Sequence, residues 1–459
     1  MNLRHSLRAL AASALVAATA LAASAQTIRD TEIEETLDVY TTPILRAAGL
    51  DPDAVDIYIV NDPALNAFVT RGQNIFLHTG LILEADTANQ LKGVIAHETG
   101  HIADGRIARS DYENRSAYGK MLVAAGVGLA AILAGEGGAG AAILSGAPQF
   151  GTIEVLSHTR TGESVADQYA ATYMERTRQS GEGLIEFFEK FRAQEVLSSS
   201  RRYPYFRSHP LSSDRIEKLR ERVAESEYRD AEEPGTDAER MRMMQAKLFG
   251  FLAAPQRVFT RYPLEDQSVE ARYARSVAYF QNAELKLALG EVDSLIADDP
   301  DNPYYHELRA QFLFESGRGD DSIPSIERAL ELKPDAPLFK LAYAQALIGR
   351  GESGDTDEAV RQLKSALVTE RDNAAAWYYL SLAHSAQGRD DLAEYAVAEQ
   401  AFSVGDFLRA KQFAERAKED LPRGEPSWRR AADIVAVAEV QLARKNKDRR
   451  GPKPFTALR

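Results

Sequence analysis

A repeated pattern in residues 300–390 constrains the fold of this 459-residue chain more than any other sequence feature. Its period is about 34 residues, the length of a common helix–turn–helix repeat. A third unit, ending at Gly388, follows the pattern less strictly after an acidic insertion near Gly354 and Asp355. Because such units stack to bury their apolar faces, we predict an all-α solenoid. The pairs that define the period are Pro300 and Pro334, Ala310 and Ala344, and Gly317 and Gly351.

These units resemble tetratricopeptide repeats, with degenerate flanking units around residues 270–299 and 391–440. We therefore expect a helical repeat domain at 246–445, followed by a basic tail at 446–459. A plain helical bundle is the alternative interpretation of the same pattern. Arrays of this kind present a concave surface to other proteins, so the resemblance implies a protein-binding domain.

The first 25 residues differ in composition from the rest of the chain. Arg4 and Arg8 form a positively charged start, an Ala- and Leu-rich run follows, and small residues at 23–25 precede Gln26. This order is typical of a secretory signal peptide that is removed after export. The alternative is a membrane anchor, but the apolar run is short compared with the ~20 strongly apolar residues of a spanning helix. We therefore predict a signal peptide at 1–25.

A second apolar stretch lies at 121–147 and is interrupted by glycines. Its longest apolar part, 121–133, is too short to span a bilayer. A buried helical hairpin is the favoured interpretation, and the alternative is an apolar flap that touches lipid or a non-native protein. We therefore expect at most peripheral contact with a membrane.

The charge and cysteine content exclude several classes of function. The chain has 55 Lys and Arg against 68 Asp and Glu, which gives a net charge of −13. Loss of Arg4 and Arg8 with the signal peptide would make the mature protein still more acidic. We expect no nucleic acid as a partner, because phosphates are bound by basic surfaces. The absence of cysteine also excludes thiol catalysis, cysteine metal ligands and a lipid-modified cysteine.

The segment that follows the signal peptide predicts a small sheet. Residues 26–50 have the pattern of an amphipathic helix. Residues 55–60 and 66–82 are rich in β-branched and aromatic side chains, with a turn at Gly72. We interpret these two segments as a small antiparallel sheet.

Helical patterns dominate from Asp86 onward, where Asp86 or Thr87 can cap the first helix. The charged stretch 227–245 contains Pro-Gly and is interpreted as a linker. It separates a domain at 26–226 from the repeats. The predicted fold class is thus α+β, mostly α, followed by an all-α solenoid. The further helices expected in the first domain are 161–178, 181–198 and 214–225.

The motif His97-Glu98-Thr99-Gly100-His101 lies within the helix that begins near Asp86. Residues four apart share one helical face, so both imidazoles can bind one metal ion. Glu98 projects from nearly the same side, where it can take a proton from water. Two surface histidines are the alternative, but Val94, Ile95 and Ile102 give the motif apolar surroundings. Since buried imidazoles need partners, we predict a zinc site.

A catalytic zinc ion generally has three protein ligands and an open fourth position. The favoured third ligand is Glu163, in the segment RTGESVADQYA. Asp167 follows four residues later on the same helical face, where its carboxylate can accept a hydrogen bond from a ligand histidine. The alternative is a solvated pair of acids, but Val165 and Ala166 favour burial.

The segments HETGH and RTGESVAD, together with NAFVTRGQNIFLHTGL, resemble the HtpX-type metallopeptidases. The likeness covers roughly residues 30–225 and implies a zincin-like fold. It also implies that His97, His101 and Glu163 bind one zinc ion per chain. In this resemblance Glu98 is the general base, and Asp167 supports a ligand. Asn66 and Ala67 begin the segment that, in similar enzymes, offers an edge strand to an extended substrate.

Ser208-His209-Pro210 followed by Arg215 resembles a further His-Pro element of this family. Arg215 is a candidate for support of the site. His209 has two functional interpretations: it stabilises the oxyanion, or it occupies the open position of the zinc and keeps the enzyme latent. A loop histidine without function is the third possibility. His78 and His158 are assigned to structural roles.

The signal peptide, the zinc motif and the repeats together predict a periplasmic zinc endopeptidase. Its expected substrates are misfolded or misassembled envelope proteins, with outer-membrane β-barrels favoured. The expected partner of the repeat domain is the outer-membrane assembly machinery. The alternative is a repeat-based periplasmic chaperone or adaptor in which the metal site is structural, and a third possibility is an exopeptidase.

Overall fold

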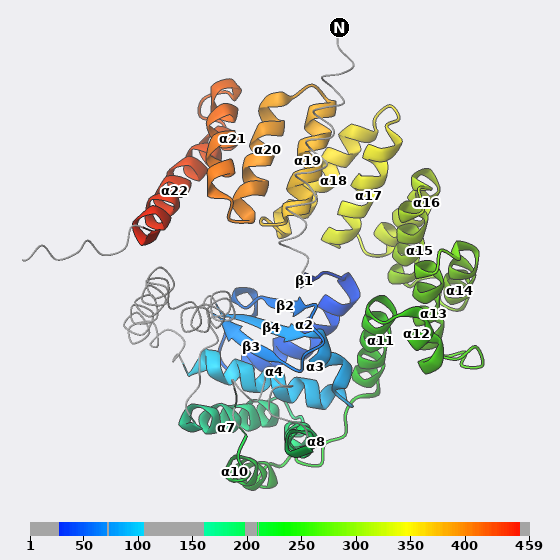
Figure 1. The fold of residues 1–459 in the computed structure, drawn as a ribbon, viewed down its shortest axis with the longest axis vertical. Coiled ribbons are helices and arrows are strands. Elements are labelled where there is room, and N and C mark those ends of the chain that lie inside the picture. Colours follow the sequence, from blue (N-terminus) through cyan, green and yellow to red (C-terminus); the bar gives the residue numbers. More distant parts are fainter. Residues whose placement is uncertain (1–26, 71–72, 105–159, 198–208, 210, 450–459) are drawn as a thin grey trace, which may run out of the picture. The chain divides into compact units, whose positions relative to one another are not determined.

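The computed structural model describes residues 27–70, 73–104, 160–197, 209 and 211–449. The predicted signal peptide, the apolar stretch at 121–147 and most of the basic tail lie outside these residues. The chain forms two compact units, one within Ser24–Phe249 and the other within Gly250–Arg459 (Figure 1). Every helix in the described ranges is too short or too polar to span a bilayer.

The N-terminal unit contains a sheet of four short strands: β1 (Thr27–Ile28), β2 (Ile57–Val60), β3 (Ala67–Thr70) and β4 (Asn74–His78). Their order is β1-β2-β4-β3. β1 pairs antiparallel with β2, and β3 pairs antiparallel with β4, but β2 and β4 are parallel. The sheet is therefore mixed rather than antiparallel as predicted. The reason is that the chain passes from β2 to the outer strand β3 before it returns to the central strand β4.

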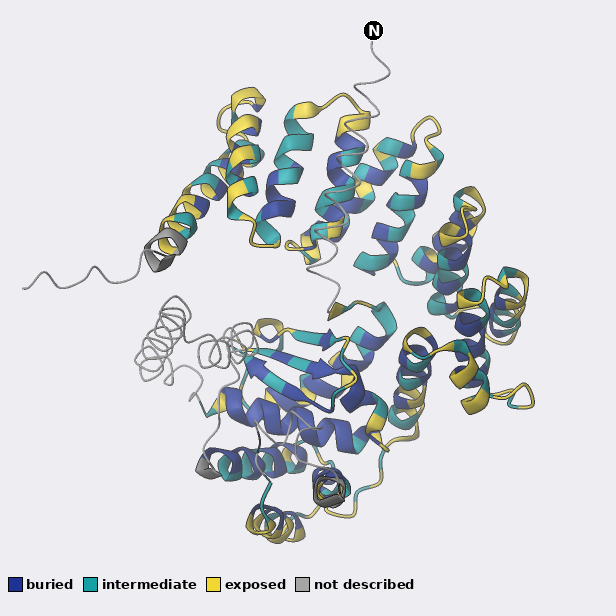
Figure 2. Cartoon of the chain, in the orientation of Figure 1, coloured by how far each residue is buried: buried dark blue, intermediate teal, exposed yellow. Residues whose placement is uncertain are grey.

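Helix α4 (Ala88–Ala103) is the centre of the N-terminal unit. It is buried along almost its whole length (Figure 2), because a helix that precedes it and helices that follow it in the sequence pack around it. Their side chains join those of the sheet in one apolar core. The helices that pack against α4 are α2 (Thr31–Ala47), α7 (Arg160–Arg176) and α8 (Glu182–Leu197). The same unit also contains the short 3-10 helix at Pro52–Ala54, α3 (Thr79–Glu84) and α10 (Ser213–Ala224).

The N-terminus of α4 is held by side chains from near and far in the sequence. Thr87 is the N-cap residue, and its hydroxyl accepts a hydrogen bond from the backbone N–H of Gln90. The carboxylate of Glu233 accepts hydrogen bonds from the N–H groups of Ala88 and Asn89, at 3.3 and 2.9 Å. A carboxylate at this position satisfies free N–H groups and complements the helix dipole.

The segment expected to be a linker, 227–245, differs from that expectation. Most of α11 (Gly235–Leu252) lies in it, and Met241 and Met244 of this helix belong to the core of the N-terminal unit. In addition, the buried Lys92 of α4 forms an ion pair with Asp237. The charged composition of this stretch therefore includes one largely buried ion pair as well as exposed surface.

The C-terminal unit consists of consecutive helices joined by short turns. Its helices are α12 (Pro255–Arg261), α13 (Val269–Gln281), α14 (Leu285–Asp298), α15 (Pro303–Glu315), α16 (Gly319–Leu332), α17 (Pro337–Arg350), α18 (Asp355–Thr369), α19 (Ala374–Ala386), α20 (Asp390–Ser403), α21 (Phe407–Asp420) and α22 (Pro426–Arg449). Neighbouring helices share small apolar cores. The mostly helical α+β fold class, with a helical array after it, is confirmed.

The residues that define the 34-residue period occupy equivalent places. Gly317 and Gly351 follow α15 and α17 with φ values of 76° and 69°, a left-handed conformation that glycine adopts without steric cost. Pro300 and Pro334 lie just beyond α14 and α16, where proline stops a helix from continuing. The period thus marks the helix ends.

Candidate active site

The HETGH motif lies on the buried part of α4, as its sequence predicts. His97 and His101 are one helical turn apart, and their Nε2 atoms are separated by 3.1 Å. Both rings are buried and lie edge to face, with an interplanar angle of 90°. The helix therefore presents two imidazole nitrogens to one point in the interior.

Helix α7 supplies two carboxylates to the same region. Glu163 and Asp167 lie four residues apart and are both buried. α7 can approach α4 closely because Gly100 has no side chain: a Cβ there would lie 3.0 Å from the carbonyl oxygen of Ala166. The glycine inside the motif thus lets the second helix deliver Glu163.

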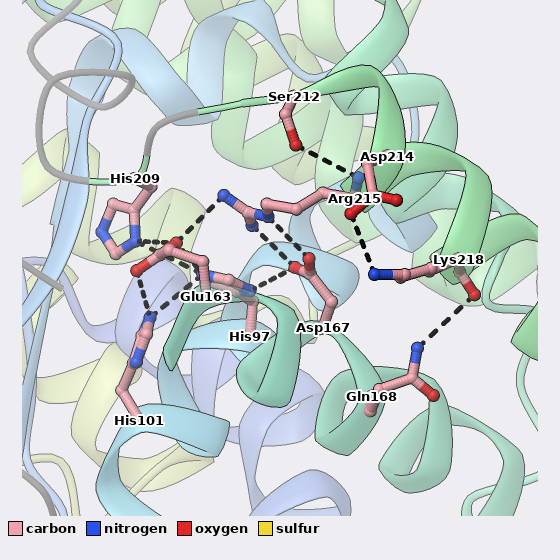
Figure 3. A network of polar contacts seen from close by, with 10 residues as sticks. All are labelled: His97, His101, Glu163, Asp167, Gln168, His209, Ser212, Asp214, Arg215 and Lys218. Carbon is pink, nitrogen blue, oxygen red and sulfur yellow. Dashed lines mark hydrogen bonds and ion pairs between the residues drawn. The ribbon is translucent and has the colours of Figure 1, made fainter. Parts of the chain in front are cut away.

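His209, from the segment before α10, completes the group. Its Nδ1 atom lies 3.1 Å from Oε2 of Glu163 and 3.3 Å from Nε2 of His97. Oε2 of Glu163 lies 3.4 Å from Nε2 of His97, and Oε1 lies 3.5 Å from Nε2 of His101. Figure 3 shows these side chains converging from three segments of the chain. The four residues each offer one ligand atom, and these atoms all lie within 4.8 Å of one another.

This arrangement fits a single divalent metal ion. With metal–ligand bonds of about 2.0–2.1 Å, the ligand atoms of a tetrahedral site lie about 3.3–3.4 Å apart. Five of the separations within the cluster are 3.1 to 3.5 Å, and no two of the four ligand atoms lie more than 4.8 Å apart. Imidazole nitrogen and carboxylate oxygen are also the donor types that zinc accepts. Oε1 of Glu163 has no hydrogen-bond partner among the described residues, as expected of a ligand atom.

The charges in the cluster attract a cation. Burial alone lowers the pKa of His97, but the carboxylates of Asp167 and Glu163 raise it to about 9. Burial alone raises the pKa of the Glu163 carboxyl, but hydrogen bonds from His209 and His97 hold this pKa far below the usual range. Without metal, a proton thus sits among these groups, and metal binding would release it.

Glu98 lies beside the cluster and is completely buried. Burial raises the pKa of its carboxyl. Oε1 lies 3.6 Å from Nε2 of His209, so the imidazole that joins the cluster through Nδ1 also faces this carboxylate. The same histidine therefore stands next to both the donor atoms and the candidate base.

Asp167 and Arg215 form a second layer around the cluster. Oδ1 of Asp167 lies 3.0 Å from Nδ1 of His97, which leaves Nε2 of that ring directed at the other donors. Arg215 donates from Nε and Nη2 to the two carboxylate oxygens of Asp167, each at 2.8 Å. Its Nη1 lies 3.1 Å from Oε2 of Glu163. One buried guanidinium thus orients both acids of α7.

The profile of peptidase family M48 matches residues 28–223, the range that contains this cluster. Residues 28–223 form a peptidase family M48 domain. The M48 domain is followed by tetratricopeptide repeats, whose family profile matches residues 273–337 and 349–404. The resemblance of each part to its family is thus confirmed. The M48 domain belongs to the metalloproteases.

Several named proteins are similar to this chain over part of its length. The beta-barrel assembly-enhancing protease of Escherichia coli K12 is 24% identical over 375 residues, which cover 80% of this chain and 75% of the relative. Metalloprotease LoiP of the same organism is 28% identical over 172 residues, or 37% of this chain and 62% of the relative. Among solved structures, the crystal structure of MamA covers 38% of this chain and 96% of its own, with 19% identity and a TM-score of 0.29.

Asn66 and Ala67, the other predicted site residues of the M48 domain, lie at the start of β3. This strand is at the edge of the sheet and contacts α4. Among the described residues, no strand pairs with its outer side. An extended chain could therefore add to the sheet at this edge.

Sequence reasoning missed Phe188 of α8. Its ring lies edge-on to His97, with centroids 6.1 Å apart, and the guanidinium of Arg215 lies 5.3 Å from its centroid. A phenylalanine on the apolar face of a helix has the pattern of any core residue, so no local signal distinguished it. Phe188 thus packs its apolar ring against both His97 and Arg215.

Proposed function

We propose that this chain is a zinc-dependent endopeptidase that binds one zinc ion through His97, His101 and Glu163. The observation that carries the proposal is the group of four buried donor atoms spaced for one ion. When bound, zinc supplies the Lewis acidity that polarises a peptide carbonyl. The catalytic part extends beyond the predicted boundary at 226, because α11 contributes to its core.

In this proposal the other residues of the site move protons and hold geometry. Glu98 takes the proton of the attacking water and delivers it to the leaving amine. Asp167 holds the ring of His97, and Arg215 holds Asp167. Asn66 and Ala67 pair with the backbone of an extended substrate, which selects for unfolded chains more than for a particular sequence.

His209 acts as a reversible fourth ligand in this proposal. Three ligands leave a zinc ion one open position for a reactant, whereas four close it. Nδ1 of His209 lies among the donors, and Nε2 faces Glu98. In this proposal the histidine would close the open metal position and face the base, and the enzyme would be latent while His209 stays there. Oxyanion stabilisation by His209 would require it to leave the donor group first.

Replacing His209 by Ala is expected to raise the rate of hydrolysis of unfolded casein, about tenfold or more, because the open position is freed. Zinc content, measured by mass spectrometry, should remain one ion per chain. A matched replacement of His306, a partly buried residue of α15 in the other compact unit, should change neither quantity. If the His209 variant instead loses activity while zinc stays bound, His209 assists the reaction and the latency proposal is wrong.

Replacing Asp167 by Ala should weaken zinc binding about 10- to 100-fold. The ring of His97 would lose the acceptor that fixes its direction, and Arg215 would lose two hydrogen bonds. Competition with a fluorescent chelator measures the change. Replacement of the exposed Asp86, just before α4 in the same domain, should leave the affinity unchanged, and an equal loss in both variants would contradict the proposed role.

We further propose that the enzyme is exported to the periplasm and removes misfolded or misassembled envelope proteins in outer-membrane quality control. Support comes from the signal-like start at 1–25 and from relatives named beta-barrel assembly-enhancing protease. The repeats would bind the outer-membrane assembly machinery, and their concave arrays suit such contacts. Cell fractionation, with sequencing of the mature N-terminus, tests export; a mature chain that retains Met1 would contradict it. Crosslinking in cells tests the partner.

A second candidate function is a periplasmic chaperone or adaptor with a structural metal. One observation favours it: structural zinc sites have four protein ligands, and four donors converge here. The two functions differ in what they need from Glu98, because only hydrolysis requires a base. An exopeptidase is distinguished by peptides with blocked ends, which only an endopeptidase cleaves.

A further inference from the structure

A second group of polar side chains lies where the edge strand β3 begins: His78 and Asn66 are buried, and Asp62 is half exposed. His78, the last residue of β4, is buried beside Asn66 and Asp62. Its Nε2 atom lies 3.5 Å from Nδ2 of Asn66, and its Nδ1 atom lies 3.7 Å from Oδ2 of Asp62. The ring also lies edge-on to Phe68 of β3, with centroids 5.8 Å apart. The sequence analysis assigned His78 to structure alone.

The position of Asp62 is fixed independently of His78. Its backbone carbonyl accepts hydrogen bonds from the hydroxyl of Thr79 and the N–H of Gly80, at 2.9 and 3.0 Å. Its Oδ1 atom accepts a hydrogen bond from the N–H of Ala64, at 2.8 Å. Gly80 lies so close to this loop that a Cβ there would be 2.2 Å from the carbonyl oxygen of Pro63. The carboxylate therefore has one defined place beside His78.

This fixed carboxylate selects the tautomer of His78. Burial lowers the pKa of the imidazole, so the ring carries one proton. The negative charge of Asp62 favours the proton on Nδ1, which lies 3.7 Å from Oδ2 without a hydrogen bond between the two atoms, and Nε2 is then an acceptor. Nε2 faces the amide nitrogen of Asn66, which can only donate. The carboxamide of Asn66 is thereby oriented with Oδ1 pointing away from His78.

Oδ1 of Asn66 is buried and has no hydrogen-bond partner among the described residues. A buried acceptor without a donor is costly, so its persistence points to a donor that arrives from outside. Asn66 immediately precedes β3, whose outer side is unpaired among the described residues. An extended polypeptide added at that edge would bring backbone N–H groups along the strand.

We propose that Asp62 and His78 are positioning residues that orient the carboxamide of Asn66, so that its Oδ1 atom accepts a hydrogen bond from a backbone N–H of the extended polypeptide substrate. The inference deepens the proposed function and rests on it. It extends the binding edge beyond the backbone pairs of β3 by one side-chain contact. It also explains why a buried histidine stands at the end of β4.

Two variants test the inference. His78→Phe keeps an aromatic ring against Phe68 but removes both ring nitrogens. Asp62→Asn keeps the size of the side chain and presents an N–H donor to His78. That donor moves the ring proton to Nε2, so the amide of Asn66 must turn and present nitrogen instead of oxygen to the substrate. His306→Phe, in the repeat unit, is the matched control.

Binding and turnover are measured separately. The dissociation constant of an extended fluorescent peptide is measured by anisotropy with full-length protein that carries Glu98→Gln, and kcat and KM are measured without that change. A series of the same peptide, N-methylated at one backbone nitrogen at a time, maps each N–H that is bound. Thermal unfolding checks that each variant is folded. If His78→Phe does not fold, Asp62→Asn alone provides the test.

Both variants are expected to raise the dissociation constant and KM about tenfold, with kcat within about twofold, because one hydrogen bond to substrate is lost. N-methylation at one position should weaken binding to the reference protein and leave both variants unaffected at that position. Asn66→Ala should behave in the same way, and His78→Phe added to it should cost nothing more. A merely structural role would not produce this dependence on a single position.

Folded variants that bind the whole peptide series as the reference protein does would overturn the inference. A reference protein that binds no extended peptide would overturn the inference and the proposed function together. Position-dependent binding without hydrolysis by any variant would contradict only the peptidase proposal. His306→Phe must match the reference protein throughout, since a loss there would show that the substitution acts through general stability.

Discussion

A Glu98→Gln protein should bind one zinc ion per chain and hydrolyse unfolded casein about a thousandfold more slowly, or not at all. Glutamine has the size of glutamate but cannot take a proton from water. Glu98 is completely buried, and burial raises the pKa of its carboxyl, which makes the carboxylate a stronger base. Zinc content and cleavage rate are measured on the same preparation.

This comparison is best made in protein that also carries His209→Ala, because a latent reference would conceal the loss. Glu84→Gln provides the matched control, since Glu84 is an exposed glutamate at the end of α3. The control should retain full activity. If Glu98→Gln retained it as well, the chain would not be a peptidase of the proposed mechanism, and the chaperone or adaptor function would be favoured.

An Arg215→Met protein should lose about 3–5 kcal/mol in the free energy of unfolding of its N-terminal unit when zinc is absent. Arg215 is buried and compensates the carboxylates of Asp167 and Glu163. Methionine fills a similar volume against Phe188 but leaves both acids without their cation. Urea unfolding of zinc-free protein, followed by circular dichroism, measures the difference.

Zinc should restore part of this stability, because the ion would compensate Glu163 but not Asp167. Arg220→Met is the matched control on the same helix α10: Arg220 is half exposed and pairs with the half-exposed Glu189. Its effect should stay within about 0.5 kcal/mol. Equal losses in the two variants would show that Arg215 contributes only as part of the helix surface.

The candidate site was largely predictable because its main signals are local. His97 and His101 are separated by one helical turn, and the apolar residues around them indicated burial. Glu163 and Asp167 repeat the same spacing on a second helix. The structure brings all four together, since Gly100 allows the two helices to approach closely. The role of each side chain in catalysis or metal binding remains a proposal.

Other features could not be predicted, because they depend on contacts between distant segments. Arg215 was only a candidate for support, and nothing in its neighbourhood indicated that it contacts two acids about fifty residues earlier. The parallel pairing of β2 with β4 depends on the path of the chain between them. The charged stretch 227–245 had the composition of a linker, yet Lys92 of α4 pairs with Asp237 in it.

The cap on α4 has a consequence for the order in which the molecule is completed. Glu233 is 145 residues downstream of Ala88, and its carboxylate accepts a hydrogen bond from the N–H of Ala88. Lys247 forms ion pairs with Asp30 and Glu32 near the start of the same unit. During synthesis, α4 would therefore emerge long before the residues that secure it. The nascent chain could not complete its N-terminal unit until α11 had followed, so the cluster on α4 and α7 would take its final form only when almost the whole unit had been made.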